Sequence, residues 1–355
     1  MIDFRYHLVS IVAVFLALAI GIVLGSTELQ GTTYNFLDRT TAKLQNEYDQ
    51  TRGQLATAQA QASEGEAYAQ AIEPAVLHDL LPGQRLLIVT EPGASSAAVA
   101  GISTAAADAG VTVTGQVAWQ PKFFDTSATT RDSLNQTTLD LNQTLNVPLT
   151  SSGTYQQQAA QLVASQILLS AQSSSSAASS SATPTPTPTP STGQGSDAQS
   201  VLAAYAQAGF LTTTGQPATQ ANLVVVVTPQ TVPADGSADQ LDQVLVPLVA
   251  ELAAKSSAIV VAGTQAGSGT GSPIAVLRSN NAANQVSTVD DADLVSGQTV
   301  VIQALAAMLG GAKAASYGFA ANGATAVAPS PAPAPSVSAS PTATATASSK
   351  KKAKK

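Results

Sequence analysis

The sequence predicts a mixed α/β protein with one apolar N-terminal helix. Short, continuously apolar runs such as residues 223–228 (LVVVVT) and 258–262 (AIVVA) alternate with segments of helical pattern. This alternation is typical of a doubly wound, Rossmann-like sheet covered by helices on both faces. The second observation is residues 8–24 (LVSIVAVFLALAIGIVL), from Leu8 to Leu24, which contain no charged side chain.

The first element, residues 1–27, is expected to be a short head and a membrane anchor. Seventeen apolar residues in a helix span about 25 Å, near the lower limit for crossing a bilayer, and no face of the run is polar. Ala17-Leu18-Ala19 fits the cleavage rule of a signal peptide, but the apolar run continues to Leu24, so we expect an uncleaved anchor. Arg5 favours a cytoplasmic N-terminus, with the bulk of the chain on the other side of the membrane.

The composition excludes several kinds of functional site and partner. Only 10% of the 355 residues are charged and there is no cysteine, which excludes disulfides, thiolate metal sites and a cysteine nucleophile. The net charge is −7, and five of the fifteen basic residues are lysines within residues 350–355. The rest of the chain is therefore strongly acidic, and we expect no nucleic-acid partner. The lysine tip is interpreted either as a contact for anionic lipid or wall polymer, or as a solvated tail.

Residues 28–82 are expected to form a coiled-coil stalk, built on one long helix from Glu28 to about Leu81. Apolar or small residues recur at alternating spacings of four and three, which is the a/d pattern of a coiled coil. The large side chains Leu37, Leu44, Tyr48 and Leu55 are the candidate partner-binding residues, for a second copy or a cell-envelope partner. The alternative is a single amphipathic helix packed on its own domain. The complete predicted seam is Leu37, Thr41, Leu44, Tyr48, Thr51, Leu55, Ala58, Ala62, Gly65, Ala69, Ile72 and Val76.

Residues 83–327 are expected to form the α/β domain. Helices are expected at residues 95–109 (capped by Ser95), 155–169, 201–208, 238–255, 273–279 and 297–309. Strands are expected at 85–90, 111–117, 223–228, 258–262 and 285–289. A Ser-rich and Thr-Pro segment at 172–199 is expected to be a disordered insertion, and the Pro/Ala/Ser-rich and Lys-rich residues 328–355 a disordered tail.

Two loops are candidate phosphate sites. The turn after the first strand, residues 91–96 (EPGASS), lacks the spacing of a dinucleotide fingerprint. The glycine-rich loop at 263–272 contains no G-K-[ST], so a mobile connection is favoured over a ligand loop. We expect no cofactor.

No catalytic or metal centre is expected either. His7 and His78 are the two histidines, and no G-x-S-x-G elbow accompanies them. Met1 and Met308 are the two methionines, too few for a dedicated Cu(I) site of soft ligands. The cluster Asp290, Asp291 and Asp293 is expected to cap the helix that follows it, with a hard-cation site as the alternative.

Several segments resemble the actinobacterial family of mycobacterial copper transport protein B (MctB). They are DFRYHLVSIVAVFLALAIGIVLGSTEL at the N-terminus, LPGQRLLIVTEPGA, VLAAYAQAGFLT, LVVVVTPQ, VSTVDDADLVSGQTVVIQALAAMLGG and SYGFAANGATAVAP. The resemblance implies a cell-envelope protein of copper efflux and homeostasis, described as channel-forming. It also implies an alternative function, a non-enzymatic coiled-coil scaffold that regulates peptidoglycan remodelling and cell separation. The sequence supports a channel only in part, because one anchor cannot line a pore and the strands lack the alternation of a membrane barrel.

Overall fold

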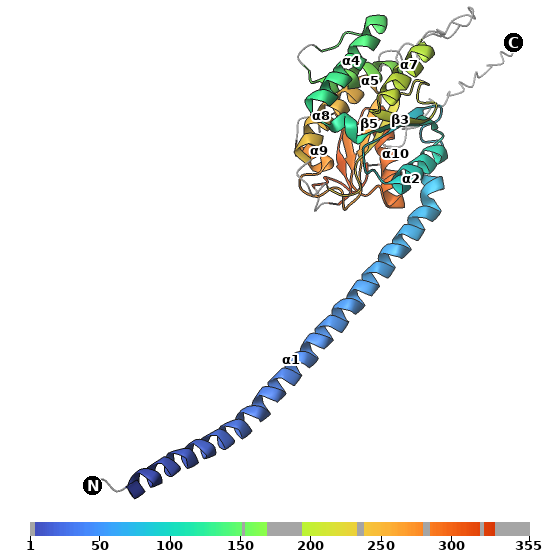
Figure 1. Ribbon diagram of the computed structural model, residues 1–355. Coiled ribbons are helices and arrows are strands. Elements are labelled where there is room, and N and C mark those ends of the chain that lie inside the picture. The colour runs from blue at the N-terminus through green and yellow to red at the C-terminus, as the bar shows by residue number, and fades with distance from the viewer. Residues whose placement is uncertain are drawn as a thin grey trace, which may run out of the picture. The chain divides into compact units, whose positions relative to one another are not determined.

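The computed structural model describes residues 4–150, 153–168, 194–232, 238–279, 285–319 and 323–330. The chain divides into two compact units, Met1–Tyr68 and Ala69–Lys355. Helix α1 (Phe4–Leu77) runs through the first unit and ends in the second (Figure 1). It is continuous where separate anchor and stalk helices had been expected. It ends at Leu77, four residues before the expected position, because Asp79 adopts a left-handed backbone with φ of 52°.

The second unit is built on a seven-stranded sheet in the order β3-β2-β1-β4-β5-β6-β7. Every neighbouring pair is parallel except β2 and β3. All five residues of β4 and of β5 are buried, as expected for central strands covered on both faces. The strands are β1 (Arg85–Thr90), β2 (Thr112–Trp119), β3 (Leu211–Gly215), β4 (Leu223–Val227), β5 (Ala258–Ala262), β6 (Ser287–Val289) and β7 (Ser316–Tyr317).

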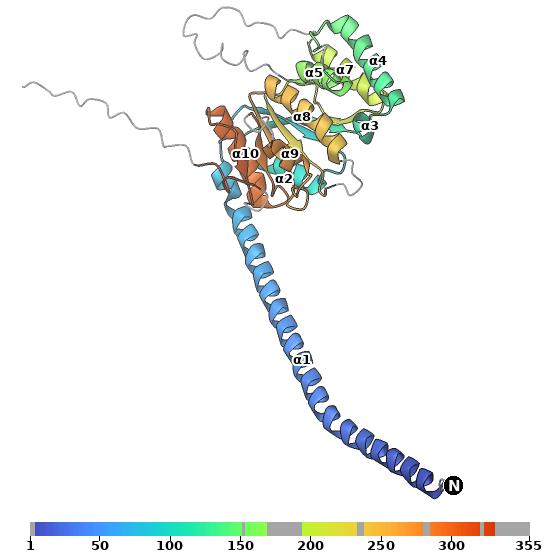
Figure 2. The ribbon, with the colours of Figure 1, turned by 90° about the vertical axis from the view of Figure 1, so that its left-hand side faces the viewer.

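Helices of the second unit pack on both faces of this sheet. Successive residues of β1 serve opposite faces: Leu87 and Val89 join one apolar core, and Leu86 and Ile88 the other. The first core takes its helical residues from α3, α4, α5, α7, α8 and α9, and the second from α2, α10 and the end of α1 (Figures 1 and 2). The helices are α2 (Ser96–Asp108), α3 (Pro121–Phe124), α4 (Ala128–Leu145), α5 (Tyr155–Ile167), α7 (Gln194–Gln207), α8 (Ala238–Lys255), α9 (Pro273–Ser279) and α10 (Val295–Leu309).

The mixed α/β class and the single apolar N-terminal helix are confirmed. Coiled-coil pairing and the Rossmann comparison remain predictions. Strands β3 and β7 were not anticipated, because β3 is a mostly exposed run of threonines and β7 has two residues.

The low-complexity insertion is shorter than expected at its C-terminal end. Helix α7 begins at Gln194, so residues 194–199 are helical, while 169–193 lie outside the described residues. In the tail, Ala328 packs against the second core, and residues 331–355 lie outside the described part of the chain.

Candidate functional site

The apolar part of α1 is a candidate membrane span. Its 20 residues Tyr6–Gly25 have a mean hydropathy of 2.9 and none of them is buried. At ~1.5 Å per residue they extend about 30 Å, the thickness of a bilayer core. They include no Asp, Glu, Lys or Arg. Among the described residues this is the one helix long and apolar enough to cross a membrane.

The polar part of α1 carries the predicted partner-binding residues. Leu44, Tyr48 and Leu55 are 61%, 65% and 57% exposed, and the side chain of Leu37 lies outside the described residues. The single chain therefore leaves three large apolar side chains in water along one predicted seam. Whether a second helix covers them stays a prediction.

A cavity of about 510 Å³ lies at the carboxyl ends of β1 and β2, beside the first turns of α2. The dipole of α2 is directed so that its partial positive charge is at this end, and Ser95 caps the helix by accepting a hydrogen bond from Ala98 N at 3.3 Å. The N-cap prediction is thus confirmed. The lining residues are Thr90, Glu91, Pro92, Gly93, Ala94, Ser96, Val99, Ala100, Gln116, Ala118, Trp119, Gln120 and Pro121.

Backbone contacts join the turn after β1 to the loop after β4. Glu91 N donates to Val227 O at 3.0 Å and Gln230 N donates to Gly93 O at 2.9 Å. Ala94 and Pro229 form an isolated antiparallel bridge. The cavity therefore lies on the β2 side of β1. Its lining contains no Lys, Arg or His, so it lacks the cations that a phosphate or pyrophosphate would meet.

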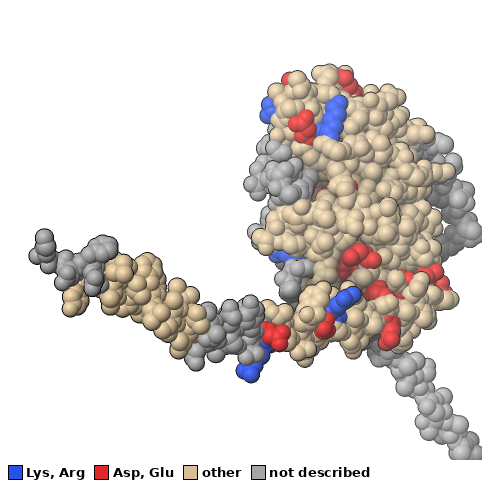
Figure 3. Space-filling view, turned by 60° about the horizontal axis from the view of Figure 1, so that its bottom comes forward, with Lys and Arg blue, Asp and Glu red and all other residues tan. Residues whose placement is uncertain are grey.

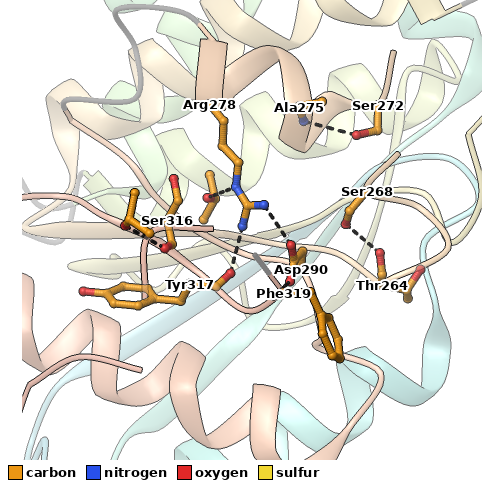
Figure 4. A network of polar contacts seen from close by, with 11 residues as sticks. Thr264, Ser268, Ser272, Ala275, Arg278, Asp290, Ser316, Tyr317 and Phe319 are labelled. Atoms are coloured by element: carbon orange, nitrogen blue, oxygen red, sulfur yellow. Dashed lines mark hydrogen bonds and ion pairs between the residues drawn. The ribbon is translucent and has the colours of Figure 1, made fainter. Parts of the chain in front are cut away.

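The glycine-rich loop after β5 is held by hydrogen bonds. Thr264 Oγ1 donates to Gln230 O at 2.8 Å, and Ser268 Oγ donates to Thr264 O at 2.6 Å (Figure 4). A side chain at Gly267 would approach Pro229 O to 2.3 Å, so glycine is needed there for close packing. Thr264, Gly267 and Ser268 are buried, while Gln265, Ala266 and Thr270 are exposed. The mobile connection stays a prediction.

Arg278 and Asp290 form a buried ion pair at the carboxyl end of β6 (Figure 4). Their side chains are 7% and 0% exposed, and Arg278 Nη1 lies 2.8 Å from Asp290 Oδ2. Arg278 also donates to Thr288 Oγ1 at 2.9 Å and to Tyr317 O at 2.8 Å, and Phe319 N donates to Asp290 Oδ1 at 2.8 Å. This network joins α9, β6 and the segment that follows β7. At the edge of this network, burial raises the pKa of the Tyr317 phenol.

Asp290 therefore has a structural role different from the predicted helix cap. The N-cap of α10 is Leu294, a residue without a polar side chain. His78 lies beside Asp79, with Nδ1 3.2 Å from Oδ2, and both side chains are largely exposed. Within the described ranges, no three His, Asp or Glu residues are grouped closely enough to hold a metal ion.

Trp119 and Gln116 line the cavity but were not singled out in the sequence. A single tryptophan at the end of a strand matches no sequence motif, so nothing in the sequence marked Trp119. The cavity could not be predicted either, because it depends on how α2 packs over β1 and β2. Only the neighbouring turn, residues 91–96, had a recognisable signal.

The apolar helix and the sheet-based unit define a membrane-associated protein of mixed α/β fold. The chain belongs to the family described as copper transport outer membrane protein, MctB, whose model matches residues 1–329. It is similar to the proteins named copper transporter MctB of Mycobacterium tuberculosis (strain ATCC 25618 / H37Rv) and Mycobacterium bovis. Each is 29% identical over 324 residues, which cover 90% of this chain and 96% of the relative.

The protein of the same name from Mycobacterium leprae is 29% identical over 337 residues, covering 92% of this chain and 99% of the relative. These matches confirm the family resemblance.

Proposed function

We propose that this chain is a membrane-anchored cell-envelope protein that takes part in copper efflux and homeostasis. The observation that carries the proposal is the exposed apolar span Tyr6–Gly25 in a chain whose relatives are named copper transporters. The span anchors the chain with its N-terminus in the cytoplasm, and the α/β unit lies outside the membrane.

The chain acts by association and not by chemical conversion. A single helix cannot enclose an aqueous path, so transport requires further helices from other chains. The soft ligands needed to pass Cu(I) along a protein are scarce: there is no cysteine, and Met308 Sδ accepts a hydrogen bond from Ser287 Oγ at 3.2 Å. The chain therefore serves as a scaffold in a copper-handling assembly, without catalytic residues of its own.

A deletion strain tests this function. Cell-associated copper and copper sensitivity should rise on deletion and return to wild-type values when the full chain is restored. A chain lacking residues 6–25 should fail to restore them, because it loses its anchor. Unchanged copper content in the deletion strain would refute the proposal. If such cells also failed to separate, the result would favour the role in peptidoglycan remodelling instead.

The association surface is tested on the purified full chain in detergent. Replacing Leu44, Tyr48 and Leu55 together with glutamine should convert an oligomer into a monomer, because each buried side chain contributes about 1.5–3 kcal/mol. The matched control is Tyr68→Gln, an equally exposed α1 aromatic (67%) outside the predicted seam. Molar mass from light scattering is the readout. Equal masses for the triple variant and the wild type would exclude this seam as the interface.

A further inference from the structure

The α/β unit covers a face of α1 other than the predicted seam. In the last turns of α1, Glu73 and Leu77 are 8% and 0% exposed, whereas the seam residues Ile72 and Val76 are 37% and 42% exposed. At this end of the helix the chain's own domain therefore packs beside the seam and leaves it in water. The large seam residues further toward the N-terminus are exposed as well.

The seam defines the heptad positions of the residues on either side of it. Side chains at the e and g positions flank the seam and pair across the interface of a coiled coil. The a positions are Thr41, Tyr48, Leu55 and Ala62, and the d positions are Leu44, Thr51, Ala58 and Gly65. The e positions are Asp38, Gln45, Arg52, Gln59 and Glu66, and the g positions are Thr40, Glu47, Gln54 and Gln61. Figure 3 shows the span as a tan surface and charged side chains on the stalk.

One parallel register places opposite charges together. In a parallel coiled coil each g position faces the e position of the next heptad, five residues further along the partner helix. Glu47 of each copy then faces Arg52 of the other. Between Asp38 and Glu66, Glu47 is the one charged g position and Arg52 the one basic e position, so no other parallel register forms this pair. The remaining pairs bring no like charges together: Thr40 with Gln45, Gln54 with Gln59, and Gln61 with Glu66.

The membrane span selects the parallel orientation. The span Tyr6–Gly25 and the seam lie on one continuous helix, so every copy enters its stalk from the membrane end. The seam from Thr41 to Gly65 extends about 36 Å at ~1.5 Å per residue. An antiparallel pair would place the two spans beyond opposite ends of this length, where they could not enter the same membrane. Confinement to one membrane also raises the effective concentration of a second copy.

We propose that the partner of the stalk is a second copy of this chain, paired in a parallel, in-register coiled coil. Leu44, Tyr48 and Leu55 supply the apolar contact, and the two Glu47–Arg52 pairs select orientation and register more than they add affinity. The proposal rests on the anchored scaffold of the proposed function and names the partner of that scaffold.

Charge reversal tests the register on the full chain in detergent at low salt. Glu47→Arg should weaken self-association about five- to thirtyfold, and so should Arg52→Glu, because each variant places two like-charged pairs in its dimer. An equimolar mixture of the two variants should recover the wild-type dissociation constant within about threefold, because both pairs of the mixed dimer carry opposite charges. Sedimentation equilibrium gives the mass and the dissociation constants.

Two controls isolate the pairing between copies. Lys43 Nζ lies 3.7 Å from Glu47 Oε1 within one helix, and Glu47→Arg removes this contact in the mixture as well, so recovery in the mixture cannot come from it. Asp49→Arg changes an exposed acidic residue at a b position, away from the seam, and should leave association within about twofold of the wild type.

Introduced cysteines test the orientation, because the chain has none of its own. Thr41→Cys and Ala58→Cys should each give a disulfide-linked dimer on mild oxidation, since in-register copies bring each position opposite itself. Ala60→Cys, exposed at an f position, should stay unlinked. An antiparallel pair would link at most one of the first two variants, and a shifted parallel pair neither.

Four results would overturn the proposal: a monomeric wild type, a mass of three or more chains, a mixture that associates no more tightly than the single variants, or linkage of Ala60→Cys equal to that of Ala58→Cys. The copper content of the deletion strain is a separate readout. If copper rises on deletion while the wild type is monomeric, only the dimer is wrong. If the dimer forms as described while copper is unchanged, only the copper role is wrong.

Discussion

Replacing Asp290 with alanine should destabilise the α/β unit by about 3–5 kcal/mol, the range measured when one partner of a buried ion pair is removed. Arg278 is 7% exposed and would keep its charge without the carboxylate 2.8 Å away. Phe319 N would lose its acceptor as well. Strand β7 itself would still be held to the sheet by the hydrogen bond from Arg278 to Tyr317 O and by the short β6–β7 pairing.

The assay is thermal unfolding of the full chain followed by the emission of Trp119, which is buried in the first core. At ~2–4 °C per kcal/mol for a unit of this size, the midpoint should fall by roughly 6–20 °C. Asp140→Ala is the control, because Asp140 is an exposed carboxylate that accepts a hydrogen bond from Gln136 Nε2 at 2.8 Å. It should change stability by less than ~0.5 kcal/mol.

A double variant tests whether the loss of stability comes from the unpaired charge of Arg278. Arg278→Met combined with Asp290→Leu should lose less stability than Asp290→Ala alone, because no buried charge is left without its counterpart. The predicted cost of leaving Arg278 buried without its carboxylate is refuted if Asp290→Ala is no more destabilising than Asp140→Ala.

Two further changes test the packing. The Tyr205 hydroxyl lies 2.8 Å from Thr138 Oγ1, and burial raises the pKa of Tyr205 well above its ordinary value of 10.0. The contribution of Tyr205 to stability should therefore be constant below pH ~10 and fall as the pH rises further, since only the unfolded phenol loses its proton there. Tyr205→Phe should cost about 1 kcal/mol at neutral pH and reduce this alkaline loss, measured by urea unfolding across pH. Gly297→Ala would place a methyl group 2.0 Å from Asp291 O and should cost roughly 1–3 kcal/mol, whereas Gly269→Ala, with nothing within 4 Å, should be neutral in the same assay.

Much of the fold was predictable from short-range patterns. The runs LVVVV and AIVVA form the central strands β4 and β5 because their side chains are apolar on both faces. The edge strand β3 was not predictable. Its threonines are mostly exposed, and it is a strand because residues 211–215 pair antiparallel with β2.

The candidate sites also differ in whether the sequence alone predicts them. The candidate membrane span and the predicted seam of α1 follow from hydropathy and spacing along a single helix. The cavity does not, because Glu91, Gln116 and Trp119 come from two strand ends that only the sheet brings together. The ion pair of Arg278 and Asp290 likewise joins residues 12 positions apart through the packing of α9 against β6.

The sequence by itself determined an apolar span at the N-terminus, an acidic chain without cysteine, and a set of buried strands. These properties depend on residue type and local periodicity. Only the tertiary structure decided which residues line a cavity and that Asp290 pairs with Arg278 in place of capping a helix. Such contacts depend on strand order and helix packing, because a buried polar side chain takes whichever partner the fold brings within hydrogen-bonding distance.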